Sequence, residues 1–126
     1  MLVCDDEPIL RILVRATFDR EHYTVVVARN GHEALALARS EQPDLIVLDV
    51  VMPGRSGRSV LDALRRDPAT AAIPIIILTA WTQSADGEAM LRAGADRYLT
   101  KPFSPHALAS LVDELLSDPA APSRAA

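Results

Sequence analysis

Residues 45–50 read Leu-Ile-Val-Leu-Asp-Val, an apolar run interrupted only by a carboxylate near its end. Four consecutive large apolar residues, with no alternation of apolar and polar types, are typical of a strand buried on both faces of a parallel sheet. Runs of the same character occur at Met1–Cys4, Thr24–Ala28, Ile73–Ala80 and Tyr98–Thr100. The chain therefore has five candidate strands.

Segments with the spacing of amphipathic helices alternate with these strands. Residues 10–18 and 108–116 each place apolar or small side chains at positions i, i+3, i+4, i+7 and i+8, which line one face of a helix. Shorter helices are predicted at residues 34–38, 60–64 and 85–93. A strand–helix order repeated five times predicts an α/β fold, a doubly wound five-stranded parallel sheet with helices on both faces and right-handed crossovers.

Length and composition predict a single domain. A chain of 126 residues can bury a sizeable core without disulfides or metal, and a hydrophobic fraction of 49% argues against disorder. We expect this domain to occupy residues 1–116. Residues 117–126 are rich in Pro and Ala and cannot form a core, so we expect a tail or a truncated linker there.

The charge balance bears on the class of partner. Thirteen basic and seventeen acidic residues give a net charge of -4, which argues against direct nucleic-acid binding because that function normally needs a basic surface. The one cysteine, Cys4, cannot form an intrachain disulfide, and the sequence shows neither a signal peptide nor an apolar run of membrane-spanning length. We therefore expect a soluble cytoplasmic protein without membrane contacts.

Polar side chains stand at the carboxyl ends of the candidate strands, the edge at which open parallel sheets bind ligands. They are Asp5 and Asp6 after the first strand, Asp49 in the third, Thr79 in the fourth and Lys101 after the fifth. Each alone has an ordinary explanation, such as a helix cap, a strand-forming residue or a solvated surface charge. Together they place three carboxylates, a hydroxyl and the only lysine of the chain at one edge of the predicted sheet.

This combination of groups suits phosphoryl transfer. Neighbouring carboxylates repel one another and recruit a cation, and an oxygen site with few protein ligands suits Mg²⁺, which often bridges to a phosphate. A phosphoryl group in transfer carries negative charge on its equatorial oxygens, which a metal ion, a lysine and a hydroxyl can stabilise. A carboxylate can also act as the nucleophile and form an aspartyl-phosphate.

Five motifs occur in order along the chain. They are Val3–Glu7, Leu48–Gly54, Leu78–Ala80, Ala93–Asp96 and Tyr98–Phe103. Through these motifs and their spacing, the sequence resembles the receiver domain of two-component response regulators, the CheY-like family, over residues 1–116. The resemblance implies a flavodoxin-like (βα)5 fold with strand order 2-1-3-4-5.

The resemblance implies a phosphorylation site with a metal ion. Asp49 looks like the phosphoacceptor, which would become 4-aspartylphosphate. Asp5 and Asp6 look like ligands of Mg²⁺, joined by the Asp49 carboxylate and the backbone carbonyl of Val51. By the same resemblance the chain is not a true enzyme but a phosphoacceptor that assists its own phosphorylation and dephosphorylation.

Three further residues are similar to the switch residues of the family. Lys101 would contact the phosphoryl oxygens, Thr79 would be the switch hydroxyl, and Tyr98 the aromatic switch. The resemblance also implies a phosphorelay in which a sensor histidine kinase or a phosphotransfer protein donates the phosphoryl group. The output would be a change on the face of the fourth helix, fifth strand and fifth helix, which controls a downstream protein or a fused effector domain.

Other functions use some of the same groups. A haloacid-dehalogenase-type phosphatase also has a strand-end Asp and Mg²⁺, but that family has a second Asp two residues after the nucleophile, where this chain has Val51. A dinucleotide-binding enzyme would need a G-x-G-x-x-G motif after the first strand, which the sequence lacks. A degenerate receiver that acts only as a scaffold would not be expected to retain the full set of acidic, hydroxyl and lysine residues.

The Lys101→Arg variant tests the role of the lysine. We expect it to fold normally but to lose most of the phosphorylation-driven switch, because a compact ammonium suits a single phosphoryl oxygen better than a broad guanidinium fork. Circular dichroism would check the fold, and binding of a downstream partner or spectral changes on phosphorylation would check the switch. Normal switching by the variant would show that the switch does not require a lysine at this position.

Overall fold

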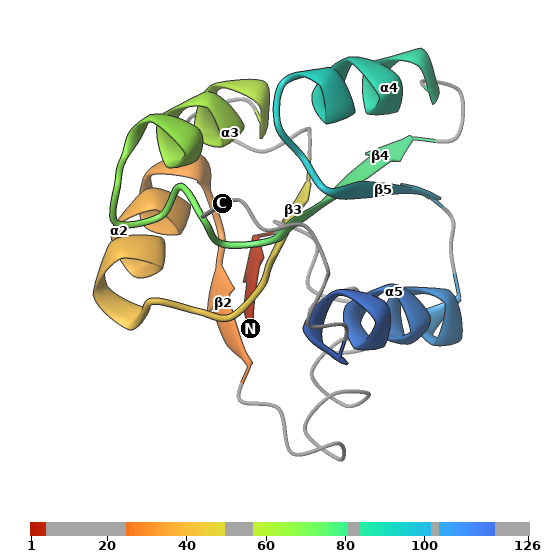
Figure 1. Ribbon diagram of the computed structural model, residues 1–126, viewed down its shortest axis with the longest axis horizontal. Helices are drawn as coiled ribbons and strands as arrows, with labels where there is room; N and C mark the ends of the chain where they lie inside the picture. The colour runs from red at the N-terminus through yellow and green to blue at the C-terminus, as the bar shows by residue number, and fades with distance from the viewer. Residues whose placement is uncertain (5–24, 50–56, 81–83, 102–103, 118–126) are drawn as a thin grey trace.

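The computed structural model describes residues 1–4, 25–49, 57–80, 84–101 and 104–117, and it confirms the predicted fold class (Figure 1). All strands are parallel and form one five-stranded sheet in the order β2-β1-β3-β4-β5. The strands are β1 (Leu2–Cys4), β2 (Val26–Ala28), β3 (Ile46–Asp49), β4 (Ile75–Ala80) and β5 (Arg97–Lys101). The helices are α2 (Gly31–Glu41), α3 (Gly57–Arg66), α4 (Ser84–Arg92) and α5 (Pro105–Ser117). The helix predicted at residues 10–18 lies outside the described residues.

The strand boundaries differ slightly from the sequence expectation at β4 and β5. The apolar run that begins at Ile73 becomes a strand only at Ile75, because Pro74 between them has no N–H group to donate to a neighbouring strand. Its carbonyl still accepts from the Ile46 amide at 2.9 Å. Strand β5 is longer than expected and includes Arg97 and Lys101, because backbone pairing with β4 continues beyond the apolar residues.

The sheet is covered on both faces, and alternate side chains of each strand serve two separate cores. In β3, Ile46 and Leu48 pack in the core beneath α2, α3 and α4, whereas Val47 packs in the core beneath α5. Figure 1 shows these two layers of helices on opposite sides of the sheet. A strand between two cores has no face left for water, which explains the unbroken apolar run.

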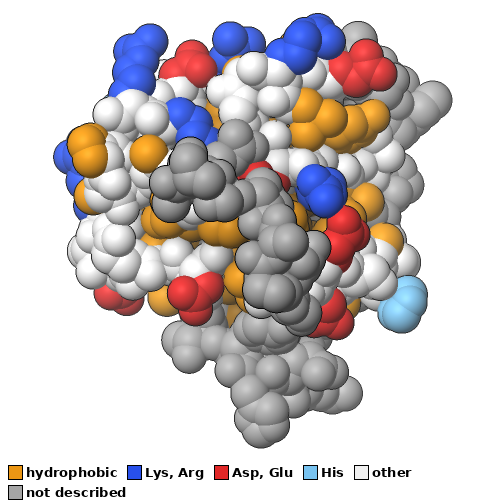
Figure 2. Space-filling view, viewed as in Figure 1, with side chains coloured by type: hydrophobic (Ala, Val, Ile, Leu, Met, Phe, Trp, Pro, Cys, Tyr) orange, Lys and Arg blue, Asp and Glu red, His pale blue; other side chains and the backbone are white. Residues whose placement is uncertain are grey.

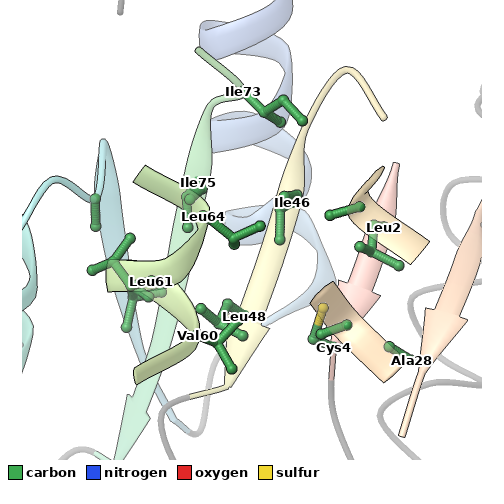
Figure 3. Packing of buried hydrophobic residues seen from close by; sticks show 14 of the residues in the cluster. Leu2, Cys4, Ala28, Ile46, Leu48, Val60, Leu61, Leu64, Ile73 and Ile75 are labelled. Carbon is green, nitrogen blue, oxygen red and sulfur yellow. The ribbon is translucent and has the colours of Figure 1, made fainter. Parts of the chain in front are cut away.

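The larger core is built around α3. Its residues Val60, Leu61 and Leu64 lie against Leu48 and Ile75 of the sheet, and all five are at most 1% exposed. Figure 3 shows the helix side chains pointing down onto the strands, with Ile46 between β1 and β4. The spacing of the three helix residues puts them on one face of α3, so that Arg58 and Arg66 remain exposed.

Local signals set the ends of the helices. Asn30, the N-cap of α2, accepts a hydrogen bond from the Glu33 amide at 2.9 Å. The Ser104 hydroxyl accepts from the Ala107 amide at 3.1 Å, and Pro105 is the first residue of α5. Gly94, which follows α4, has a φ of +120°, a conformation that a side chain would strain. Capping and turn residues therefore mark the starts of α2 and α5 and the end of α4.

The turn between α3 and β4 is held by a carboxylate. Asp67 accepts hydrogen bonds from the Ala69 amide and from the Arg39 side chain of α2, and these bonds hold the pKa of Asp67 below its usual value. The Thr70 hydroxyl, which is buried, donates to the Leu64 carbonyl at 2.7 Å. These contacts fix the direction in which the chain enters β4.

Charge is unevenly distributed over the helices. Helix α3 carries Arg58, Arg65 and Arg66 against one acidic residue, whereas α5 carries Asp113 and Glu114 and no Lys or Arg. Figure 2 shows most of the basic side chains along the edge over α3 and α4, with some acidic ones among them, and further acidic side chains on the lower half of the molecule. None of the described helices combines the length and apolarity that a membrane crossing requires.

Replacement of Leu61 by Ala tests the importance of the larger core. The side chain is fully buried, so its truncation leaves a cavity, and we expect a loss of about 2–5 kcal/mol in the free energy of unfolding. Leu91→Ala is the matched control, because Leu91 is 36% exposed on α4, and it should change stability by less than about 1 kcal/mol. Urea denaturation of both variants would give the two values, and equal losses would contradict this account of the core.

Candidate functional site

The sheet brings three of the predicted site residues to its carboxyl edge. Asp49 is the last residue of β3 and lies level with Leu78 of β4. Thr79 follows in β4, and Lys101, the last residue of β5, lies level with the next residue, Ala80. Since neighbouring strands are about 4.8 Å apart, these residues lie on three adjacent strands at successive levels of one edge.

Two of these polar residues are buried. Asp49 is 5% exposed and Thr79 is 1% exposed, although each belongs to a strand that is otherwise apolar. Burial of a carboxylate is costly unless a cation or hydrogen-bond donors compensate its charge. A buried Asp at this edge of the sheet is therefore a residue whose charge hydrogen-bond donors or a cation must compensate.

The predicted ligands from the first strand fall partly outside the described residues. Cys4, the last residue of β1, lies level with Leu48, the residue before Asp49. Asp5 and Asp6, which follow in the sequence, and Val51 are not among the described residues. No group of three or more His, Cys, Asp or Glu side chains placed to hold a metal occurs in the described part of the chain. The magnesium site stays a prediction, and its donor chemistry is consistent with the buried Asp49.

Thr79 and Tyr98 lie on the same side of the sheet. Ile75 and Ile77 of β4 pack in the core beneath α2, α3 and α4, and by strand alternation Thr79 is on that face too. Tyr98 is level with Ile77 and packs, partly buried, against the same core. Helix α4 covers this region, since it packs against both β4 and β5. The structure thus connects the polar edge to α4 through two neighbouring strands.

One buried polar group received no role in the sequence analysis. Asp96, which precedes β5, is 7% exposed, and its carboxylate forms an ion pair with Arg65 of α3 at 3.1 Å. The sequence showed Asp96 only as the end of a motif, and Arg65 only as one of many arginines. No signal in the sequence pairs two residues 31 positions apart. The pair lies at the opposite edge of the sheet from Asp49.

Comparison with known proteins gives a consistent result. A family model of the response regulator receiver domain matches residues 1–113. The chain is 42% identical over 125 residues to the alkaline phosphatase synthesis transcriptional regulatory protein PhoP of Bacillus subtilis, covering 98% of this chain and 51% of PhoP. It is 37% identical over 117 residues to the protein PilH of Pseudomonas aeruginosa, covering 93% of this chain and 97% of PilH. The chain thus spans about half the length of the first relative and nearly all of the second.

A solved structure with a related sequence has the same fold. It is the receiver domain of the sensor histidine kinase PA1611 from Pseudomonas aeruginosa PAO1, with a magnesium ion coordinated in its active site cleft. The two structures superpose with a TM-score of 0.84 at 28% sequence identity, over 93% of this chain and 96% of that one. The magnesium ion is a property of that structure.

Proposed function

The chain belongs to the response regulator receiver domain family, and we propose that it accepts a phosphoryl group on Asp49 from a histidine kinase or a phosphotransfer protein. The observation that carries the proposal is the buried carboxylate of Asp49 at the carboxyl edge of the sheet, with Thr79 and Lys101 on the next two strands. This edge is where open parallel sheets place their ligands.

The chemistry at Asp49 is a nucleophilic displacement. A carboxylate oxygen of Asp49 forms a bond to phosphorus while the phosphorus–nitrogen bond to the donor histidine breaks, and the imidazole keeps the electron pair and takes up a proton. Burial of Asp49 would prolong the product, because it limits the access of water to the acyl phosphate that forms. The domain itself supplies the nucleophile and the surroundings, while the partner supplies the phosphoryl group.

Mg²⁺ fits the donor set of this edge. Asp5, Asp6, the Asp49 carboxylate and the Val51 backbone carbonyl would hold it, an all-oxygen set of the kind that Mg²⁺ prefers. When bound, the ion would neutralise the negative charge that carboxylates and phosphoryl oxygens bring together. Lys101 would contribute a second positive charge at the same edge, from the strand beyond Thr79.

The described residues also offer a route from the site to the outer surface. Negative charge gained at Asp49 would attract the Thr79 hydroxyl on the neighbouring strand. Movement of Thr79 would alter the space that Tyr98 occupies, because both lie on the face covered by α4. Phosphorylation would thus shift the population of two packings of α4, β5 and α5, and this face would bind a downstream protein or a fused effector domain.

Treatment with Mg²⁺ and acetyl phosphate tests phosphorylation directly. We expect mass spectrometry to show an adduct with the mass of one phosphoryl group, which disappears in Asp49→Asn and in the presence of a chelator. Asp62→Asn is the matched control, because this carboxylate lies on the outer face of α3 and pairs with Arg58, and it should leave the adduct unchanged. An adduct that survives in Asp49→Asn would contradict the assignment.

A pair of substitutions at Thr79 separates phosphorylation from switching. Thr79→Val keeps the shape of the buried side chain but removes the hydroxyl, whereas Thr79→Ser keeps the hydroxyl. We expect both variants to form the adduct, but only Thr79→Ser to retain the changes in the NMR signals of Tyr98 and α4 on addition of Mg²⁺ and beryllofluoride. Equal changes in the two variants would show that the hydroxyl does not transmit the signal.

A further inference from the structure

Arg65, in the last turn of α3, joins three segments of the chain. Its Nε donates to the Gly94 carbonyl at 2.9 Å, and its Nη1 donates to the carbonyls of Ala71 and Ile73 at 3.0 and 2.7 Å. Its Nη2 donates to the Asp96 carboxylate at 3.1 Å. One guanidinium thereby connects α3 to the segment before β4 and to the turn between α4 and β5.

Asp96 completes this cluster from the other side. Its side chain is fully buried, and the Oδ2 atom that binds Arg65 also accepts from the Ile75 amide at 2.8 Å. The Asp96 amide in turn donates to the Ile75 carbonyl at 2.9 Å. Loss of Arg65 would remove the positive charge that faces the buried Asp96 carboxylate, and breaking a buried ion pair in this way is costly.

The end of α4 is fixed at the same place. The Ala95 amide donates to the Met90 carbonyl at 3.0 Å, and Met90 is 5% exposed in the core. At Gly94, a Cβ atom would lie 3.2 Å from the Cγ atom of Arg65, so the arginine passes directly over the glycine. The turn that follows α4 is thus held against Arg65 of α3 by close packing as well as by a hydrogen bond.

The next residue ties β5 to the other layer of helices. Arg97 donates to the Asp96 carbonyl and to the Glu114 carboxylate of α5, both at 2.8 Å. The side chains of Arg97 and Glu114 are 41% and 53% exposed, so this pair is weaker than the buried one. Asp96 and Arg97 therefore connect the amino-terminal end of β5 to α3 on one face of the sheet and to α5 on the other.

We infer that Arg65 and Asp96 form a fixed anchor for the amino-terminal end of β5 and the carboxyl-terminal end of α4. This inference rests on the proposed function, because it concerns how the switch is transmitted. The anchor lies at the edge opposite Asp49 and Thr79. A change that begins at the phosphorylation edge therefore moves the near ends of α4 and β5, while their far ends stay in place. Arg65 is a positioning residue. Because it holds the far ends of α4 and β5, a change at the phosphorylation edge tilts these two elements.

The guanidinium is essential to this role. Its planar fork reaches three carbonyls and a carboxylate at once, whereas a lysine ammonium is a single point with three donors. Arg65→Lys keeps the positive charge beside Asp96 but loses the fork. Asp96→Asn keeps an acceptor for the Ile75 amide but loses the charge. Arg66→Lys, one residue further along α3 and exposed, is the matched control.

Hydrogen exchange without phosphodonor tests the anchor itself. In Arg65→Lys we expect the amides of Ala95 and Asp96 to exchange on the order of tenfold faster relative to the Leu2 amide, which bonds to the Leu45 carbonyl at the start of β1 and β3. Arg66→Lys should leave this ratio unchanged. Equal acceleration of all three amides, or no acceleration, would overturn the anchor. If Arg65→Lys fails to fold, Asp96→Asn provides the same comparison.

Loading with Mg²⁺ and beryllofluoride tests the transmission. In the unaltered protein we expect the NMR signals near Thr79 and Thr100, which are level with each other at the phosphorylation edge, to shift, while those of Ala93–Asp96 stay in place. In Arg65→Lys the shifts should extend to Ala93–Asp96. Equal shifts at both ends in the unaltered protein would overturn the inference. If loading changes no signal, the proposed function fails, and the exchange ratio without phosphodonor still decides whether the anchor exists.

Discussion

The burial of β3 on both faces is the constraint on which the rest of this structure depends. Its side chains enter two cores in alternation, Ile46 and Leu48 on one side and Val47 on the other, so no polar residue can occur before the strand ends. The first polar residue, Asp49, therefore lies at the carboxyl edge, and it is still buried. A sheet enclosed by helices confines reactive groups to its edges, where they can meet ligands without disrupting a core.

The two edges of the sheet then differ in character. At the carboxyl edge, Asp49 and Thr79 are buried polar residues whose proposed roles depend on a phosphoryl group and a cation supplied from outside. At the opposite edge, the charges of Arg65 and Asp96 satisfy each other within the chain. The carboxyl edge is therefore suited to a change in conformation, whereas the opposite edge is suited to keep its conformation. Helix α4 and strand β5 extend from one edge of the sheet to the other. One end of each element can therefore move while the other end is held, as we infer above.

Much of the fold could be predicted from local patterns. Five apolar runs indicated the strands, Asn30 and Ser104 mark helix starts, and the family resemblance implied the strand order that the sheet shows. The limits of β4 and β5 were less accessible, because they depend on pairing between strands and on the missing N–H of Pro74. The predicted roles of Asp5, Asp6 and Val51 concern residues that the structure does not describe.

The sequence by itself determined the fold class and the family, because periodicity, turn residues and motif spacing depend only on the order of the amino acids. It also determined which residue types stand at the strand ends. Only the tertiary structure decided that Asp49 and Thr79 are buried on neighbouring strands, and that Arg65 binds Asp96 across 31 positions. Burial and ion pairing arise from the packing of segments distant in sequence, and local pattern contains no information on which distant partners will meet.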